Sequence, residues 1–259
     1  MTVPSTEPQT EPQTEAQAER FLALQGTLNT RDLGGLPLAA GGVTKRGRFL
    51  RSDGPFALTD DDVDLLLGLP LTTVIDLRQG QELEREPSRL AKRPGVDVHN
   101  IEVWSRIEAN GGSRPADRFD ITAAYLAALD HAGGAFAEAV TVMAAAEGAT
   151  LFHCTAGKDR TGLLAALTLE AVGVDRDTVI DDFSLTHERI GPLRERLLVQ
   201  AEQDGYARND FQRLLGATPD LIVPALDHLD ARYGGAVAYL QRVGVSEATL
   251  TALRAKLSG

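Results

Sequence analysis

Residues 153–162 read His153-Cys154-Thr155-Ala156-Gly157-Lys158-Asp159-Arg160-Thr161-Gly162, and they connect two apolar segments. The segment before them, Ala149 to His153, is rich in β-branched and apolar residues and predicts a short buried strand. The segment after them, Arg160 to Val172, has no polar face before Glu170 and predicts a buried helix. A strand followed directly by a helix indicates an α/β fold with a largely parallel sheet.

Strand and helix signals also alternate before this stretch. Thr59 is a suitable cap for a helix whose first turn is acidic and which Gly68 and Pro70 end. We expect three consecutive leucines to form the apolar side of this helix, namely Leu65, Leu66 and Leu67. Further strands are predicted over Thr72–Leu77 and Val96–Val103, and further helices near 118–129 and 134–146. We therefore predict a central, largely parallel sheet that is flanked by helices.

The two ends of the chain differ in character. Residues 1–20 form a polar, acidic tail with a repeated Thr-Glu-Pro-Gln theme, which predicts disorder. Residues 21–259 are interpreted as a single domain. Within it, 175–259 lacks strand signals and is expected to be a helical extension on the same core. Thr218 with Pro219 starts one of its helices, and Ser246 caps a last one that carries Leu250, Leu253 and Leu257 on one side.

Bulk composition excludes several classes of protein. The chain has 259 residues, and 26 Lys and Arg against 37 Asp and Glu give a formal charge of −11, which disfavours nucleic acid as a partner. No apolar run approaches the ~20 residues that span a bilayer, so no integral membrane segment is expected. No secretory signal is recognisable, so we expect the protein in the cytoplasm or exported by another route. The single cysteine and the spacing of the five histidines indicate neither a disulfide nor a metal site, and we expect no cofactor.

The stretch 153–162 contains the groups needed to cleave a phosphate ester. Cys154 stands between a strand and a helix, and a thiol ionises more readily at a helix N-terminus beside cations. The planar fork of Arg160 can hold two phosphate oxygens at once. Gly157 allows a tight turn that directs backbone N–H groups inward from Thr155, Ala156, Gly157 and Lys158. The stretch therefore predicts a nucleophile in a phosphate-binding loop.

Other residues of the stretch have supporting roles in this interpretation. Thr161 is expected to hydrogen-bond the cysteine sulfur, and His153 to fix the loop. Asp159 is an acid in a loop otherwise suited to an anion, and we interpret it as the general acid that protonates the leaving oxygen. Asp76 ends a strand, where it could hold Lys158 or Arg160, act as a second acid, or form a structural ion pair.

Three other interpretations of residues 153–162 are compatible with the same sequence. A lone cysteine is ordinarily a small buried apolar residue. The loop could belong to a phosphate-recognising binding protein with vestigial turnover, although such a module needs neither Cys154 nor Arg160. It could also belong to a rhodanese-like sulfurtransferase, which does not require an acid beside the arginine. A nucleotide-binding P-loop is excluded because Phe152 stands where its first glycine is required.

At this stretch the chain resembles the cysteine phosphatases, whose signature is His-Cys, five residues, Arg, then Ser or Thr. The inner letters are similar to those of bacterial atypical tyrosine and lipid phosphatases, including the mycobacterial tyrosine phosphatase B type. The resemblance extends over about residues 24–259 and includes these segments: Asn29-Thr30-Arg31-Asp32-Leu33-Gly34-Gly35, Arg48-Phe49-Leu50-Arg51-Ser52, Leu58-Thr59, Val74-Ile75-Asp76-Leu77-Arg78 with Glu82, Arg232-Tyr233-Gly234 and Val243-Gly244-Val245. Thr30 departs from the family, which has an aromatic residue there.

The resemblance implies a single α/β phosphatase domain with a helical lid, for which we assign about residues 185–230. It implies metal-independent hydrolysis of phosphotyrosine through a phosphocysteine, with phosphoserine, phosphothreonine and phosphoinositides as further candidates. The substrate partner is thus a phosphorylated protein or a phosphoinositide. Ordinary tyrosine phosphatases carry their acid in a Trp-Pro-Asp loop, but the only tryptophan here is followed by Ser105, which favours Asp159. Lys158 is expected on the pocket rim, where it could meet a second phosphate or a lipid headgroup.

Overall fold

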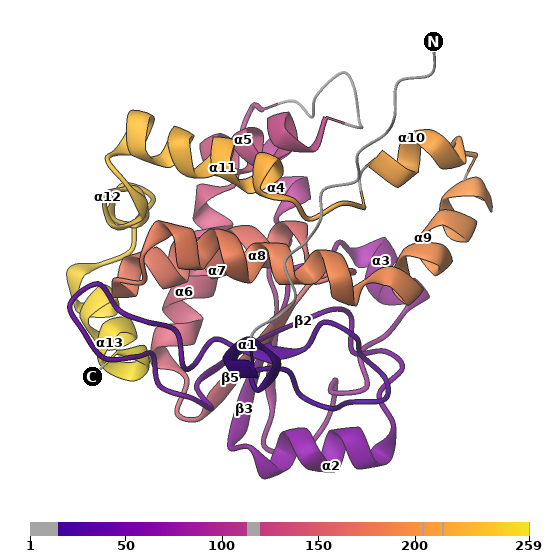
Figure 1. Ribbon diagram of the computed structural model, residues 1–259, viewed down its shortest axis with the longest axis horizontal. Coiled ribbons are helices and arrows are strands. Elements are labelled where there is room, and N and C mark those ends of the chain that lie inside the picture. Colours follow the sequence, from indigo (N-terminus) through magenta and orange to yellow (C-terminus); the bar gives the residue numbers. More distant parts are fainter. Residues whose placement is uncertain (1–14, 113–119, 204, 214, 259) are drawn as a thin grey trace.

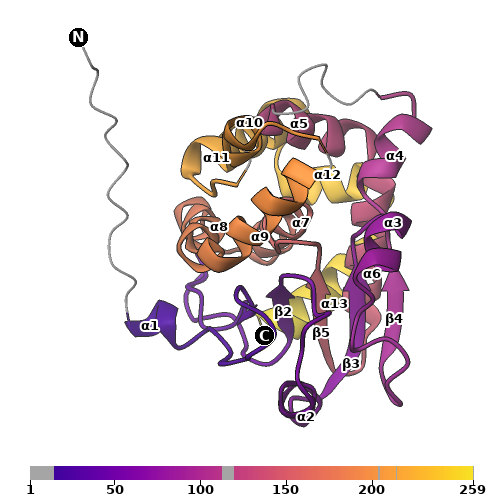
Figure 2. The same cartoon turned by 90° about the vertical axis from the view of Figure 1, so that its right-hand side faces the viewer.

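The computed structural model describes residues 15–112, 120–203, 205–213 and 215–258. A five-stranded sheet has the order β1-β2-β5-β3-β4. The pairs β2–β5, β5–β3 and β3–β4 are parallel, and the short β1 runs antiparallel to β2 (Figure 2). The strands are β1 (Arg31–Asp32), β2 (Phe49–Ser52), β3 (Leu71–Asp76), β4 (Asp97–Asn100) and β5 (Ala149–His153). The predicted α/β fold with a largely parallel sheet is confirmed.

Helices and connecting loops form the rest of the described chain (Figure 1). They are α1 (Glu15–Ala18), α2 (Asp60–Gly68), α3 (Gly80–Arg85), α4 (Trp104–Ala109), α5 (Ile121–His131), α6 (Gly133–Ala145), α7 (Asp159–Val172), α8 (Arg176–Arg189), α9 (Gly191–Gln203), α10 (Arg208–Arg213), α11 (Pro219–His228), the π-helix η1 (Leu229–Tyr233), α12 (Ala236–Arg242) and α13 (Glu247–Leu257). No helix within the described ranges is both long and apolar enough to cross a bilayer.

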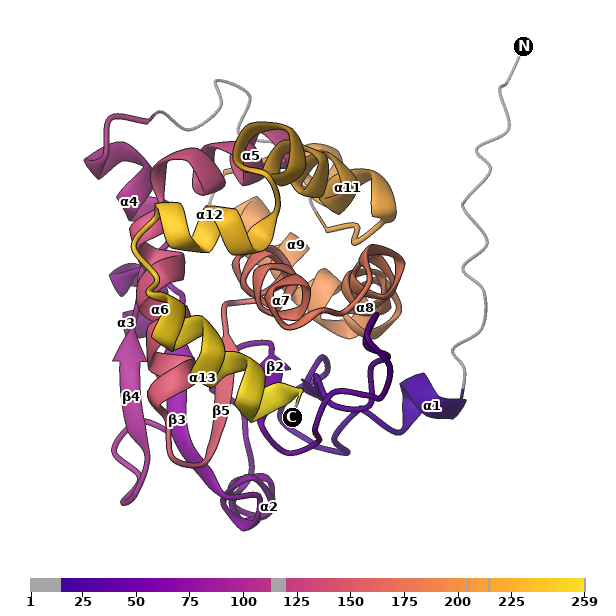
Figure 3. The ribbon, with the colours of Figure 1, turned by 90° about the vertical axis from the view of Figure 1, so that its left-hand side faces the viewer.

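The sheet separates two apolar clusters because successive strand residues point to opposite faces. Leu151 of β5 belongs to the smaller cluster, together with Val63 and Leu66 of α2. Its neighbour Phe152 belongs to the larger cluster, which contains core residues of α5 to α8 and of α11 to α13. α13 lies alongside α6 in this layer (Figure 3). The C-terminal helices and the sheet therefore share one core.

Local signals in the sequence place several helix ends correctly. Thr59 caps α2, and its side chain accepts a hydrogen bond from Asp62 N at 3.1 Å. Ser246 caps α13 in the same way, with a hydrogen bond from Thr249 N at 3.1 Å. The predicted apolar side of α2 is wrong, because Leu65 is 44% exposed and Leu67 is 37% exposed. Consecutive helical residues point about 100° apart, so three leucines in a row cannot share one face.

The last residues of the predicted tail have regular structure. Residues 1–14 of the predicted disordered tail lie outside the described residues. Glu15–Ala18 form α1, and Arg20 is buried, with an ion pair to Asp182 of α8. The boundary after residue 20 is therefore placed too late.

The predicted strand over Val96–Val103 is too long, because β4 ends at Asn100 and α4 begins at Trp104.

Candidate active site

The candidate nucleophile lies at the carboxyl end of the central strand. β5 ends at His153, Cys154 follows, and α7 begins at Asp159. Cys154 is 1% exposed, and the strands on both sides of β5 are parallel to it. α7 is buried along nearly its whole length, as its sequence predicted. Because a helix N-terminus offers unpaired N–H groups and a partial positive charge, the loop between β5 and α7 can bind an anion.

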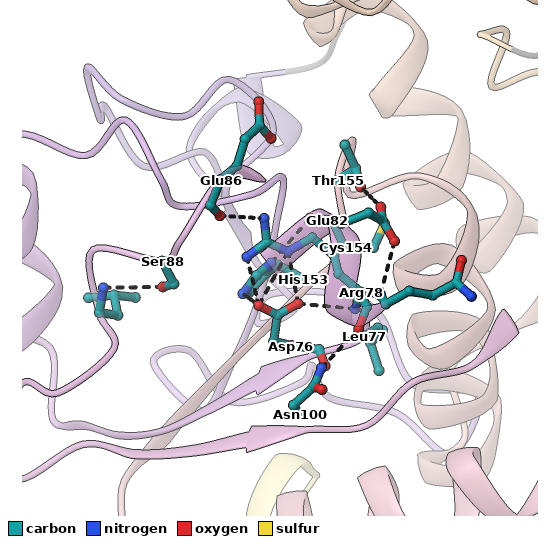
Figure 4. A network of polar contacts seen from close by, with 12 residues as sticks. Asp76, Leu77, Arg78, Glu82, Glu86, Ser88, Asn100, His153, Cys154 and Thr155 are labelled. Atoms are coloured by element: carbon teal, nitrogen blue, oxygen red, sulfur yellow. Dashed lines mark hydrogen bonds and ion pairs between the residues drawn. The ribbon is translucent and has the colours of Figure 1, made fainter. Parts of the chain in front are cut away.

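Arg160 is held by a carboxylate from outside the loop. Glu82 of α3 accepts hydrogen bonds from Arg160 Nη1 at 2.6 Å and from Nη2 at 2.9 Å. Thr155 Oγ1 donates to the same carboxylate, and it accepts from Arg160 Nη2 at 3.1 Å. Figure 4 shows Glu82 and Thr155 meeting beside Cys154. Glu82 thus orients the guanidinium. The family resemblance included Glu82 but did not assign it this role.

The charges of this group reinforce one another. Burial opposes the charged form of Glu82, but the hydrogen bonds and the charge of Arg160 outweigh it and lower the pKa of Glu82 to about 2. Burial also opposes the charge on Arg160. The bonds from Glu82 and the nearby negative charges of Cys154, Glu82 and Asp159 outweigh it, so the pKa of Arg160 lies above its usual range. The guanidinium is therefore a permanent cation close to the candidate nucleophile.

Two buried polar atoms of α7 have no hydrogen-bond partner among the described residues, Arg160 Nε and Thr161 Oγ1. A buried donor without a partner is costly, so Arg160 Nε is suited to receive a ligand oxygen. The expected hydrogen bond between Thr161 and the cysteine sulfur is absent. Thr161 is fully buried, and its helical position fixes where its hydroxyl can reach.

Asp76 is tied to the loop's support and not to its cations. It accepts from Arg78 Nη2 at 2.7 Å and from Arg78 Nε at 2.9 Å, and its Oδ2 lies 3.5 Å from His153 Nε2 (Figure 4). Burial opposes its charge, but His153 and Arg78 lower the pKa of Asp76. Of the three roles considered for Asp76, the contacts match the structural ion pair and contradict a direct hold on Lys158 or Arg160. Burial lowers the pKa of His153, and its Nδ1 lies 3.1 Å from the Cys154 carbonyl oxygen, so it fixes the loop.

Asp159 lies at the first position of α7, and its side chain is 23% exposed. Its Oδ1 accepts a hydrogen bond from the hydroxyl of Tyr125 at 2.6 Å and lies 3.1 Å from Lys158 Nζ. Lys158 itself is 1% exposed. Its ammonium lies beside the Asp159 carboxylate, and the expected place of Lys158 on the pocket rim stays a prediction.

Side chains of Asn29 and Arg51, which we call the brace, hold the backbone of the loop from behind. Asn29 Nδ2 donates to the carbonyl oxygens of Ala156 at 3.1 Å and of Gly157 at 3.3 Å, and Arg51 Nη2 donates to Gly157 O at 2.8 Å. Gly157 has a φ of +66°, and a Cβ at this position would lie 2.5 Å from the carbonyl oxygen of Ser52. With the carbonyl groups held on the outside, the N–H groups of the loop are free to face an anion.

The brace continues into a buried cluster of charge. The guanidinium groups of Arg20, Arg31 and Arg51 meet the single carboxylate of Asp182, and all four side chains are at most 3% exposed. Burial and the charge of Arg51 lower the pKa of Arg31 to about 9, against the opposing effect of Asp182. Arg31 thus has a buried structural contact, and its partner is an aspartate 151 residues later in the chain.

The start of α9 covers the loop. Ala156 packs in a small apolar cluster with Ile190, Leu193 and Leu197. Arg196 forms an ion pair with Glu86 and lies 4.4 Å from the centre of the Phe56 ring. Later in the same segment, Arg208 pairs with two acids of the segment itself, Glu195 and Glu202. No group of three or more His, Cys, Asp or Glu among the described residues is arranged to hold a metal ion.

Comparison with known proteins identifies the family. A family model described as "Tyrosine phosphatase family" matches residues 22–259. The chain belongs to the tyrosine phosphatase family. This confirms the resemblance first seen in residues 153–162, and it gives a phosphatase context to the geometry around Cys154.

Relatives of this phosphatase are found among bacterial enzymes. The triple specificity protein phosphatase PtpB of Mycobacterium tuberculosis is 29% identical over 279 residues, which cover 91% of this chain and 98% of PtpB. A tyrosine-protein phosphatase of Nostoc commune is 32% identical over 227 residues and covers 81% of this chain and 74% of its own. Among solved structures, P. aeruginosa TpbA is similar with a TM-score of 0.35 at 22% identity, over 65% of this chain and 85% of TpbA.

Proposed function

We propose that this phosphatase hydrolyses the phosphate ester of phosphotyrosine in proteins through a covalent phosphocysteine intermediate, with Cys154 as the nucleophile. Arg160 and the backbone N–H groups of residues 155–158 hold the phosphate oxygens, and Asp159 is the general acid and base. Phosphoserine, phosphothreonine and phosphoinositides remain further candidate substrates. The name of the relative PtpB, a triple specificity protein phosphatase, supports a range wider than one ester.

The observation that carries this proposal is the relation between Cys154 and Arg160. The nucleophile lies where the central strand meets α7, and the guanidinium is held beside it by Glu82. Two of its nitrogens are engaged by Glu82, while the buried Nε has no partner among the described residues. A dianionic phosphate placed at this Nε would meet a fixed cation and the N-terminus of a buried helix at the same point.

The chemistry then divides into two steps. In the first, a bond forms between Cys154 Sγ and phosphorus, the bond from phosphorus to the tyrosine oxygen breaks, and Asp159 gives that oxygen a proton. In the second, a water oxygen bonds to phosphorus, the sulfur–phosphorus bond breaks, and Asp159 takes a proton from the water. Inorganic phosphate leaves, and the thiolate and the acid are restored. The fixed charges of Arg160 and of the α7 N-terminus stabilise both transition states.

The alternative functions considered from the sequence require different groups in the loop. A rhodanese-like sulfurtransferase has no use for an acid beside the arginine, and membership in the tyrosine phosphatase family speaks against it. A binding protein with vestigial turnover would keep the loop but release no phosphate. For phosphoinositides, the expected headgroup contact is the ammonium of Lys158, which is 1% exposed in this structure.

Release of inorganic phosphate tests the proposal. The wild-type enzyme should release it from phosphotyrosine peptides and from para-nitrophenyl phosphate, should be inhibited by vanadate, and should be indifferent to chelators. Cys154→Ser should abolish turnover with an unchanged circular dichroism spectrum, because a serine hydroxyl is not ionised by this loop. Near-normal turnover in C154S would overturn the mechanism. Phosphate binding with no turnover in the wild type would favour the binding protein.

A further inference from the structure

The hydroxyl of Tyr125 is hydrogen-bonded to the carboxylate that we propose as the general acid. Its oxygen lies 2.6 Å from Asp159 Oδ1, and the two residues come from different elements, α5 and α7. Tyr125 is fully buried, whereas the side chain of Asp159 is 23% exposed. The tyrosine thus lies on the protein side of the carboxylate, and the solvent side of Asp159 is left for substrate.

The Tyr125 ring has little freedom to move. It packs edge to face against Phe183 of α8, with centroids 6.4 Å apart and planes at 85°. It also belongs to the large apolar cluster. A buried tyrosine needs a partner for its hydroxyl, and here that partner is Asp159. A rigid ring therefore carries a donor to one particular oxygen of the acid.

Both of the donors described above converge on the same carboxylate oxygen. Tyr125 Oη and Lys158 Nζ contact Asp159 Oδ1, at 2.6 Å and 3.1 Å. An oxygen that accepts two such bonds is a poor position for a proton, so the acid form of Asp159 carries its proton on Oδ2. The contact with Tyr125 thereby selects the oxygen that transfers the proton and fixes the rotation of the carboxyl group.

Tyr125 is itself unsuited to proton transfer. Burial, followed by the negative charge of Asp159 and the bond to it, raises the pKa of Tyr125 well above its ordinary value of 10. The hydroxyl therefore stays protonated at any pH at which the enzyme works. It can donate a hydrogen bond throughout the reaction, but it does not give up its proton.

We propose that Tyr125 is the positioning residue of the general acid: it holds Asp159 Oδ1 so that Oδ2 faces the leaving oxygen in the first step and the attacking water in the second. This inference rests on the proposed function, since it assigns a partner to the acid of that mechanism. The proton moves between Asp159 Oδ2 and the leaving oxygen or the water, and the tyrosine proton stays on Tyr125 throughout.

The test is Tyr125→Phe, which removes one oxygen and keeps the ring. Phenyl phosphate has a poor leaving group that needs a proton, and para-nitrophenyl phosphate has a good one that hardly needs it. We expect Y125F to lower kcat/KM for phenyl phosphate about tenfold, and to change it little for para-nitrophenyl phosphate, since a hydrogen bond to a charged group is lost. In an Asp159→Asn background, Y125F should cause no further selective loss.

Tyr239→Phe is the matched control. Tyr239 is equally buried, belongs to the same apolar cluster, and donates its hydroxyl to Leu129 O at 2.9 Å, away from the loop. Y239F should leave the ratio of the two substrates unchanged. If Y125F slows both esters equally, or still acts selectively in D159N, the inference is wrong. Where the wild type is active and C154S inactive, that outcome overturns only the role of Tyr125; an active C154S overturns the proposed function.

A second variant covers the case in which Y125F does not fold. Site-specific 3-fluorotyrosine at position 125 keeps the ring and the hydroxyl but makes the hydroxyl a stronger donor. It should shift the ratio of the two kcat/KM values, and 3-fluorotyrosine at position 239 should not. An unchanged ratio at position 125 would overturn the inference.

Discussion

Glu82 and Arg160 are joined by two hydrogen bonds, although 78 residues separate them in the sequence. Glu82 Oε2 accepts from Nη1 at 2.6 Å and Oε1 accepts from Nη2 at 2.9 Å. The pair links α3, which follows β3, to the first turn of α7, which follows β5. The orientation of Arg160, the arginine that we propose to bind phosphate, is therefore set by a helix that contributes nothing to the loop itself.

Glu82→Gln should reduce turnover, because the amide keeps one acceptor but loses the charge and the symmetric grip on the guanidinium. We expect kcat/KM for para-nitrophenyl phosphate to fall about tenfold. Glu84→Gln is the control, since Glu84 lies exposed on the same helix. If E82Q and E84Q have the same kcat/KM, the contact with Glu82 is not needed to orient Arg160.

The pH dependence of this pair follows from the pKa of Glu82, which is about 2 instead of 4.5. A carboxyl with a lowered pKa contributes its full stability above its unfolded pKa and loses it as the pH falls from about 4.5 to about 2. The difference in free energy of unfolding between E82Q and the wild type should thus be the same at pH 5 and pH 7. A difference that shrinks between these values would contradict the pairing.

Asn29→Ala should loosen the phosphate loop. It removes both donors to the carbonyl oxygens of Ala156 and Gly157 and leaves these buried acceptors with fewer partners. We expect the free energy of unfolding to fall by about 1–3 kcal/mol, and kcat/KM to fall as well. Denaturant titration and phosphate release measure the two effects. Asn110→Ala removes a comparable bond to His131 O away from the loop, and it should leave kcat/KM unchanged.

Arg196→Ala should open the segment that covers the loop. Cys154 is 1% exposed, so a substrate can reach it only after something moves, and we propose that α9 is part of a lid within about residues 185–230. The variant removes the ion pair with Glu86 and the contact with the Phe56 ring. We expect peroxide to inactivate R196A several times faster than the wild type, since an exposed thiolate is more easily oxidised.

Arg208→Ala provides the control for this experiment. Its partners, Glu195 and Glu202, belong to the same proposed lid, so losing them removes charge without releasing the segment from the rest of the protein. R208A should be inactivated at the wild-type rate. Equal rates for all three proteins would show that α9 is an ordinary packed helix.

Glu170→Gln should stabilise the protein at high pH only. Burial, together with the nearby charge of Asp230, raises the pKa of Glu170 to about 7, against the opposing effect of Arg176. Because the folded state holds a proton that the unfolded state releases near pH 4.5, wild-type stability falls as the pH rises from about 4.5 to about 7. We expect E170Q to gain about 1 kcal/mol over the wild type at pH 8 and little at pH 4.5. An equal gain at both pH values would contradict a raised pKa.

The sequence predicted the parts of this protein that depend on near neighbours along the chain. β5 and α7 could be read from an apolar strand that meets an apolar helix. The caps Thr59 and Ser246 were also correct, because a cap bonds to a backbone group three residues away. The loop letters between Cys154 and Arg160 were sufficient to predict a phosphatase family.

Partners across the fold were not predictable in this way. Glu82, Tyr125, Asn29 and Asp182 each contact the loop or its supports from a separate element. The family resemblance included Glu82 and Asn29, but it gave neither of them a partner. The side of a loop that a residue faces depends on how that loop is turned, and here the contacts of Asn29 and Arg51 set the turn.

Sequence alone therefore determined where the proposed reacting groups of this protein stand. Cys154, Arg160 and Asp159 lie within seven positions, at a strand-to-helix junction whose local geometry follows from hydrogen bonds between near neighbours. Only the tertiary structure decided which atoms of these side chains are hydrogen-bonded, and to which partner residues. Arg160 is fixed by Glu82 and Asp159 by Tyr125, because packing brings together α3, α5 and α7, which are remote in the chain. The distance between two such elements is set by packing in the shared core, so it cannot be predicted from a short segment of the sequence.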